Sequence, residues 1–401
     1  MSTREHGHCA DCHCHYLPGL MTVPSDRMDE AIRIVGGRAL DNGELCRVLD
    51  GLDHEIVSRI RELVGVFEIG EDDPHQIAGA LAKQGMRAAP VHGVGFMGHS
   101  GYQGSQWTDA NIVLTPVTDA EGGIVAVVDS GVAPDLPYWI DDPNVIFERP
   151  VDTEQLPHKD PVSHGTFVTS VIRRITPQHA VSIASARPDP GHLVTTEPYH
   201  DEAHRMLRPP TDELNVLGAV LRLIRRHANG HGEVLALNLS LGAHECEHTN
   251  GGFYLSLEAA RDIWMQHFPD APIVAAGGNS TCPRPVIPAA LDGVRAVAAA
   301  REGRSRSKSG DSGGVIKVWH HGTEVTAPDR DWITDVGPGC DVIGLSGQSD
   351  DHTVKWSGSS FATAVVTACL ADGGYTPTPD DGKEWWPDRN VTYGSVSGLV
   401  P

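Results

Sequence analysis

Apolar and polar positions follow different patterns on the two sides of residue 122. From Gly122 onward, short continuous apolar runs alternate with stretches of helical periodicity. A continuous apolar run suits a strand that is buried on both faces, and strands that alternate with helices form a parallel sheet between layers of helices. We therefore predict an α/β fold, with strands within 124–128, 180–186, 234–241, 272–279 and 294–299 and helices over 164–175, over 215–227 and from Ser360 onward.

The first hundred residues have a helical pattern instead. Between Asp26 and Lys83, apolar residues recur every three or four positions, as on one side of an amphipathic helix: Leu49, Leu52, Ile56, Val57, Ile60 and Leu63. The run from Asp41 to Glu44 is typical of a helix start, and Asp73 with Pro74 predicts another helix through Ala82. Residues 87–95 are interpreted as extended chain. The pattern predicts a small N-terminal helical region.

Acidic residues outnumber basic ones. The 53 Asp and Glu against 31 Lys and Arg give a net charge of −22. Nucleic acids and anionic membranes attract basic surfaces, so this charge argues against both as partners. No stretch approaches the roughly 18 apolar residues of a membrane span, and Met1 to His8 contain no apolar run typical of a secretory signal. We expect a cytoplasmic protein with mostly reduced cysteines, or a Cys282–Cys340 pair if the chain leaves the cell.

Potential metal ligands are concentrated near the N-terminus: His6, His8, Cys9, Cys12, His13, Cys14 and His15. Three thiols and four imidazoles exceed the four ligands of a tetrahedral zinc site. No second ligand pair follows in a partner hairpin, however. We interpret the segment as a disordered tail and keep zinc binding as the alternative.

Three short polar segments lie at the ends of predicted elements. Asp129 ends the apolar run from Ile124, His164 begins a helix in His-Gly-Thr, and Ser360 begins another in Gly-Ser-Ser-Phe-Ala. A serine hydroxyl needs a base to remove its proton during attack, and an imidazole held by a carboxylate can take and return that proton. The order acid, base, nucleophile is that of subtilisin. The chain therefore resembles the subtilisin-like serine proteases, the subtilases.

Two further segments follow the order of that family. Pro272 to Asn279 ends in an Asn that the resemblance implies will donate a hydrogen bond to the oxyanion, and Leu237 to Gly242 resembles the substrate-binding strand. The resemblance therefore assigns catalysis to Asp129, His164 and Ser360. It assigns the oxyanion contact to Asn279 and substrate binding to Ser240, Leu241, Gly242, Ala276, Gly277 and Gly278.

The chain departs from the family pattern beside its predicted catalytic residues. Phe167 and Ser170 stand where the family commonly has His and Gly. Ser359 stands in place of the usual Thr, and Ala364 in place of a frequent Pro. None of these changes removes a catalytic atom.

The resemblance also divides the chain. It implies a subtilisin-like three-layer catalytic domain over 96–375, preceded by the tail 1–20 and the helical region 21–95 and followed by a tail over 376–401. Many subtilases carry an N-terminal region that assists folding and blocks the cleft. Residues 21–95 are interpreted either as such a pro-peptide or as a simple helical appendage.

The predicted activity is that of a serine endopeptidase, which hydrolyses a polypeptide substrate through an acyl-enzyme on Ser360. The competing hypothesis is a catalytically weak or inactive subtilase-like protein that binds peptides, and an esterase or acyl transferase is a third. No cofactor is predicted for this chemistry. Calcium, which subtilases often bind through acidic loops, is an alternative at 141–144 and 350–351.

Overall fold

The computed structural model contains two compact units. One consists of residues 1–95, 186–224 and 243–266, and the other of 96–185, 225–242 and 267–401. The structure describes the following residues: 7–8, 15–49, 52–96, 106–107, 122–132, 144–147, 162–186, 211–230, 232–244, 254–279, 285–300, 316–320, 323–327, 332–339, 342–345, 353–356 and 358–373. The second unit carries the residues that are predicted to be catalytic.

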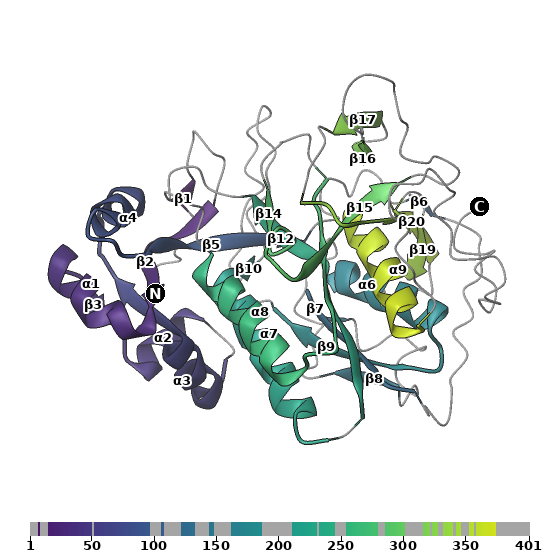
Figure 1. Ribbon diagram of the computed structural model, residues 1–401, viewed down its shortest axis with the longest axis horizontal. Helices are drawn as coiled ribbons and strands as arrows, with labels where there is room; N and C mark the ends of the chain where they lie inside the picture. Colours follow the sequence, from purple (N-terminus) through teal and green to yellow (C-terminus); the bar gives the residue numbers. More distant parts are fainter. Residues whose placement is uncertain are drawn as a thin grey trace. The chain divides into compact units, whose positions relative to one another are not determined.

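A seven-stranded sheet forms the framework of the second unit (Figure 1). Its strands pair in parallel throughout. In spatial order they are β18 (Asp335–Pro338), β15 (Val294–Ala300), β13 (Ile273–Ala276), β11 (Val234–Leu239), β7 (Ile124–Asp129), β9 (Ala180–Ser185) and β8 (Val145–Phe147). The predicted α/β class is therefore correct, and five of these strands lie where continuous apolar runs predicted them.

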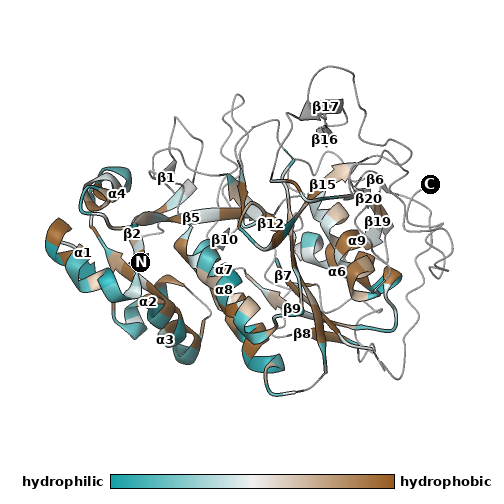
Figure 2. Cartoon of the chain, viewed as in Figure 1, coloured by the Kyte–Doolittle hydropathy of each residue, from teal (hydrophilic) through white to brown (hydrophobic). Residues whose placement is uncertain are grey.

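Two helices pack beside each other in this unit, α6 (Val162–Ile175) and α9 (Ser359–Ala371). Helix α9 is in contact with β11, β13 and β15, and its residues are buried from Ser359 to Cys369. Figure 2 shows β7 and β9 as mostly hydrophobic, which matches their burial between other elements. Because α9 is enclosed in this way, its first turn is held firmly against the sheet.

Smaller strands complete the second unit. Strand β19 (Val342–Leu345) pairs with β20 (Thr353–Trp356), which also pairs with β6 (Gln106–Trp107). Strands β16 (Ile316–His320) and β17 (Thr323–Ala327) form an antiparallel pair, and β14 (Val286–Ile287) is a short strand. Strand β12 (Leu241–His244) follows β11 after a single residue.

The first unit contains an antiparallel sheet with the order β5-β2-β4-β3. These strands are β2 (His15–Pro24), β3 (Arg38–Ala39), β4 (Val64–Glu68) and β5 (Ala89–Phe96), with β1 (Gly7–His8) paired to β2 and β10 (Thr211–Asp212) paired to β5. The helical elements are η1 (Ser25–Arg27), α1 (Met28–Val35), α2 (Asn42–Val48), α3 (His54–Leu63), α4 (Pro74–Ala82), α7 (Glu213–His227) and α8 (Leu255–His267).

The N-terminal region has the predicted helices and also a sheet that the sequence analysis did not predict. The apolar series that predicted one helix lies only partly in a helix: its residues from Ile56 to Leu63 are on α3, whereas Leu49 caps the end of α2 and Leu52 lies between the two helices. The break arises because the Asp53 carboxylate accepts a hydrogen bond from Ile56 N (2.9 Å) and starts a new helix. The predicted start at Asp41 is confirmed as a capping box with Glu44. Strand β4 was missed because its buried residues continue the apolar series of α3 without a polar break.

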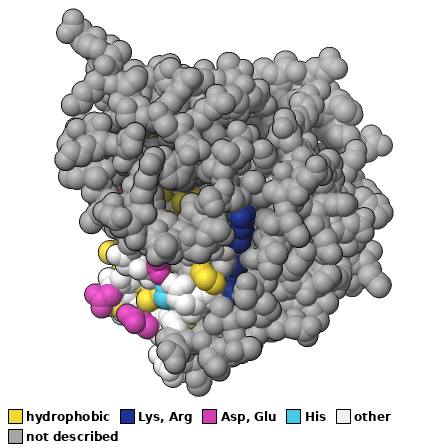
Figure 3. Space-filling view, turned by 90° about the vertical axis from the view of Figure 1, so that its right-hand side faces the viewer, with side chains coloured by type: hydrophobic (Ala, Val, Ile, Leu, Met, Phe, Trp, Pro, Cys, Tyr) yellow, Lys and Arg dark blue, Asp and Glu magenta, His cyan; other side chains and the backbone are white. Residues whose placement is uncertain are grey.

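The described surface has few large apolar side chains. Ile34 and Met265 are the exposed large hydrophobic residues among those that the structure describes. On the face shown in Figure 3, the few described side chains include acidic, basic, histidine and hydrophobic groups. None of the described helices has both the length and the apolar composition that a membrane crossing requires.

Candidate active site

The predicted site lies where strands of the parallel sheet end. Asp129 is the last residue of β7, Ser240 directly follows β11, and Asn279 lies shortly after β13. The carboxyl ends of parallel strands meet at one edge of a sheet, which is where ligands bind in open α/β folds. The topology thus gathers residues that are far apart in the chain.

The other two polar side chains of the site, His164 and Ser360, lie on helices. His164 lies in the first turn of α6, and Ser360 is the second residue of α9. A helix N-terminus directs unpaired N–H groups and a partial positive charge toward its surroundings. Ser360 is therefore placed where negative charge that develops during a reaction is favoured.

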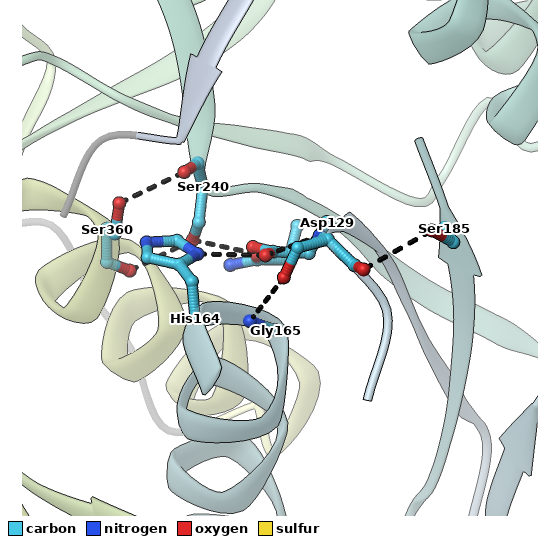
Figure 4. A network of polar contacts seen from close by, with 8 residues as sticks. Asp129, His164, Gly165, Ser185, Ser240 and Ser360 are labelled. Atoms are coloured by element: carbon cyan, nitrogen blue, oxygen red, sulfur yellow. Dashed lines mark hydrogen bonds and ion pairs between the residues drawn. The ribbon is translucent and has the colours of Figure 1, made fainter. Parts of the chain in front are cut away.

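Asp129 and His164 form a buried pair. His164 Nδ1 lies 2.8 Å from Asp129 Oδ1, and the same carboxylate oxygen accepts a hydrogen bond from Ser130 N at 2.7 Å. Both side chains are almost fully buried. Since the carboxylate accepts, Nδ1 carries the proton of the neutral imidazole, and Nε2 has the lone pair that can act as a base. Figure 4 shows the imidazole between Asp129 and Ser360.

A glycine allows this close approach of α6 to the end of β7. A Cβ on Gly165 would lie 2.1 Å from Gly131 O, closer than atoms can pack, and would make a tight contact of 3.1 Å with Asp129 Oδ1. The Gly165 amide instead donates to Ser130 Oγ at 3.0 Å. The glycine of the His-Gly-Thr segment is thus required by the packing beside the acid.

Ser360 Oγ is buried and donates to the carbonyl oxygen of Ser240 at 3.0 Å. The hydroxyl has a single proton, so attack with His164 as the base requires that proton to turn from Ser240 to the imidazole. Catalytic hydrogen bonds are often formed fully only when substrate is bound. The neighbouring Ser359 hydroxyl belongs to the same helix turn and is also buried.

The orientation of Asn279 follows from its partner. Its Oδ1 accepts a hydrogen bond from Ser359 N at 2.7 Å. A backbone N–H can only donate, so the oxygen of the amide is turned toward α9, and the amide NH2 group is the end that can donate elsewhere. This orientation is compatible with a donor to an oxyanion.

The residues predicted to bind substrate lie at the same edge of the sheet. Ser240, Leu241 and Ala276 are buried, and Gly278 has a positive φ of 91° that favours glycine. A Cβ on Gly277 would lie 2.6 Å from Ile333 Cδ1 and 2.9 Å from Val297 O, so this glycine is needed for packing. The Ser240 hydroxyl is directed to protein groups, Asn238 and Ser360, at 2.9 Å each. Substrate contact by this set, which includes Gly242, remains a prediction.

Aromatic side chains surround the base, a feature that the sequence analysis did not predict. The His164 ring lies 5.6 Å from Phe361 and 5.9 Å from Trp356 between centroids, and Phe167 contacts both of those rings. Gly344 accommodates Phe167, because a Cβ there would lie 2.7 Å from its ring. In the sequence, the signal for these rings was Phe167, which stands where the family commonly has His. Together these rings keep water from the sides of the imidazole.

The described residues contain no group of three or more His, Cys, Asp or Glu side chains that could hold a metal ion. The acidic segments predicted as calcium alternatives, apart from Asn144, lie outside the described residues, as do the side chains of the N-terminal His and Cys cluster. The predicted Cys282–Cys340 alternative and the C-terminal tail 376–401 also lie outside them.

Comparison with known families gives a match over most of the chain. Residues 120–372, more than half of the chain, match the model of the Subtilase family. This chain belongs to the subtilase family. The matched range contains all the residues of the candidate active site. Membership of this protease family supports a peptidase function that acts on polypeptides.

The solved structures to which this chain is similar include three that are named as proteases. The prenylagaramide maturation protease PagA is 23% identical, with 65% of this subtilase and 80% of that chain covered and a TM-score of 0.42. The self-cleaved protease domain of PatA is 23% identical, with coverage of 64% and 83% and a TM-score of 0.39. A lanthipeptide protease is 17% identical, with coverage of 62% and 72% and a TM-score of 0.42. No curated protein sequence matched this chain.

Proposed function

We propose that this subtilase is a serine endopeptidase that uses Asp129, His164 and Ser360 as its catalytic triad. The observation that carries the proposal is the buried Asp129–His164 pair, at 2.8 Å, which lies beside a serine in the first turn of α9. An acid, a base and a nucleophile in this arrangement suit acyl transfer.

In the first half of the reaction, Ser360 Oγ attacks the carbonyl carbon of the scissile peptide bond while His164 Nε2 takes the hydroxyl proton. Asp129 holds Nδ1–H, keeps the ring in place and stabilises the imidazolium that forms. The proton then passes from Nε2 to the leaving amine, the C–N bond breaks and an ester remains on Ser360. Water repeats the sequence, with His164 as its base, and releases the acid product.

Two donors are assigned to the negative oxygen of the tetrahedral intermediate. The first is the NH2 group of Asn279, whose Oδ1 is held by Ser359 N at 2.7 Å. The second is the backbone N–H of Ser360, in the first turn of α9. Loss of one such donor typically slows the reaction by about 100- to 1,000-fold, so Asn279→Ala should reduce kcat by that amount with little change in KM.

The decisive experiment is labelling of the full-length protein with a fluorophosphonate, which transfers its phosphonyl group to an activated serine and releases fluoride. The wild-type chain should be labelled once, at Ser360, and Ser360→Ala should not be labelled. Ser359→Ala is the matched control, since it removes the adjacent hydroxyl and should still be labelled. A folded wild-type protein that is not labelled would contradict the proposal and favour the peptide-binding alternative.

A further inference from the structure

Asn238 is a buried amide in the middle of a hydrophobic strand. It lies on β11 between Leu237 and Leu239, and its side chain has no exposed surface. A polar group in such a place is unfavourable unless all of its hydrogen-bonding atoms are satisfied. Its contacts therefore indicate why an amide is held there.

Both ends of the amide have partners. Asn238 Nδ2 donates to Thr367 Oγ1 at 3.0 Å, and Asn238 Oδ1 accepts from Ser240 Oγ at 2.9 Å. Thr367 Oγ1 in turn donates its own proton to Thr363 O at 2.7 Å. Since that proton is used, the Thr367 oxygen can only accept from Asn238, which determines the orientation of the amide.

The same contacts reach the nucleophile. Ser240 Oγ lies 2.9 Å from Ser360 O as well as 2.9 Å from Asn238 Oδ1, so its single proton is shared between two acceptors. Ser360 Oγ in turn donates to Ser240 O at 3.0 Å. Ser360, Thr363 and Thr367 are spaced by three and four residues, so they share one face of α9. Residues of β11 and its end thus contact this face of α9 at two points that are about two helical turns apart, Ser360 and Thr367. Figure 4 shows the contact between Ser240 and Ser360.

We infer that Asn238 is a positioning residue for the nucleophile. It has no role in proton transfer. With Thr367 and Ser240, it determines how α9 is rotated and how closely it approaches β11, and therefore where Ser360 Oγ lies relative to His164 and Asn279. This inference rests on the proposed serine endopeptidase function.

The test compares Asn238→Ala with wild type in fluorophosphonate labelling and in cleavage of an unstructured peptide substrate. We expect the labelling rate and kcat to fall about 10- to 100-fold, with KM changed by less than about twofold, since small displacements of a reacting group have effects of this order. The matched control is Asn215→Ala, which removes another buried amide whose Nδ2 donates to Asp212 at 2.8 Å, in the other unit. It should lose thermal stability and label at the wild-type rate.

A second pair of variants keeps the test decisive if Asn238→Ala fails to fold. Thr367→Val removes the hydroxyl at nearly constant volume and should slow labelling, whereas Thr367→Ser keeps the hydroxyl and should label like wild type. Where Asn238→Ala does fold, the double variant with Thr367→Val should label no more slowly than Asn238→Ala alone, because Asn238→Ala has already broken the contact that Thr367→Val removes.

Three outcomes would overturn the inference. If Asn238→Ala or Thr367→Val were labelled at the wild-type rate, the contact between these two residues would not position Ser360. An equal loss of rate in Asn215→Ala would make the effect one of general stability. An unlabelled wild-type protein would overturn the proposed function, and this inference with it.

Discussion

Among single residues, Gly165 is required for the Asp129–His164 pair because it has no side chain. Gly165→Ala would place a methyl group 2.1 Å from Gly131 O, so α6 must move away from β7 and separate His164 from Asp129. We expect fluorophosphonate labelling to slow by at least about 100-fold.

The control for this variant is Gly79→Ala, also a glycine within a helix but with no atom within 4 Å of the added Cβ. It should label normally and gain about 0.5–1 kcal/mol in stability. Normal labelling of Gly165→Ala would show that the close approach of α6 is not required.

Asp212 gives a prediction about pH. Burial raises its pKa from 3.8 to about 6, and this effect is only partly offset by the hydrogen bonds from Asn215. The folded protein therefore holds this proton more tightly than the unfolded chain, so the contribution of Asp212 to stability falls as pH rises from about 4 to 6. The difference of roughly two pKa units corresponds to about 3 kcal/mol.

Urea unfolding of wild type and Asp212→Asn at pH 4.5 and pH 7.5 checks this sign. The wild-type protein should lose stability relative to the variant as pH increases between these values, since the variant has no proton to lose there. A wild-type protein that gains stability relative to Asp212→Asn at the higher pH would contradict the direction of the shift.

At the scale of elements, one carboxylate joins a strand to two helices. Glu213, the first residue of α7, accepts hydrogen bonds from His92 N on β5 at 2.9 Å and from Ser256 N on α8 at 3.1 Å. His92 Nδ1 lies 3.1 Å from the same carboxylate, and both side chains are buried. The first unit therefore depends on hydrogen bonds to a buried carboxylate as well as on its hydrophobic core.

We expect Glu213→Ala to destabilise the protein by about 3–5 kcal/mol, as when one partner of a buried pair is removed. Glu213→Gln should be less destabilising, since one acceptor oxygen remains. Glu62→Ala is the control, because the Arg59–Glu62 pair on α3 is exposed and should contribute less than about 1 kcal/mol. Chemical denaturation of the three variants measures these differences in the free energy of unfolding. Equal losses in Glu213→Ala and Glu62→Ala would contradict the prediction that Glu213 matters more than an exposed carboxylate.

At the scale of the whole molecule, the N-terminal region shares a compact unit with segments from inside the family match. Leu52 packs against Gly218 of α7, and Arg87 forms an ion pair with Glu258 of α8 at 2.6 Å. Strand β5 pairs with β10. Removal of the first 94 residues would expose these surfaces of α7 and α8.

A chain that begins at Gly95 should therefore have a melting temperature lower than that of the full chain by at least about 5 °C. In the full-length chain, Arg87→Ala should reproduce part of this loss, whereas Ile34→Ala, at an exposed position, should not. An unchanged melting temperature would mean that the region is a separate module. Labelling of the same truncated chain tests the predicted inhibitory role of residues 21–95, since faster labelling would indicate that they block the site.

The α/β class and the positions of most strands of the parallel sheet could be predicted from the amino-acid pattern, and the resemblance to the subtilases pointed to Asp129, His164, Asn279 and Ser360 as site residues. These features are local: a continuous apolar run predicts a buried strand, and short polar segments mark where strands end and helices begin. Four features were visible only in the three-dimensional structure: the N-terminal sheet, the link from Asn238 to α9, the aromatic rings around His164 and the contact between Ser360 and Ser240. Each of these depends on which distant segments pair and on the distance between them, and the pattern along the chain does not encode that information residue by residue.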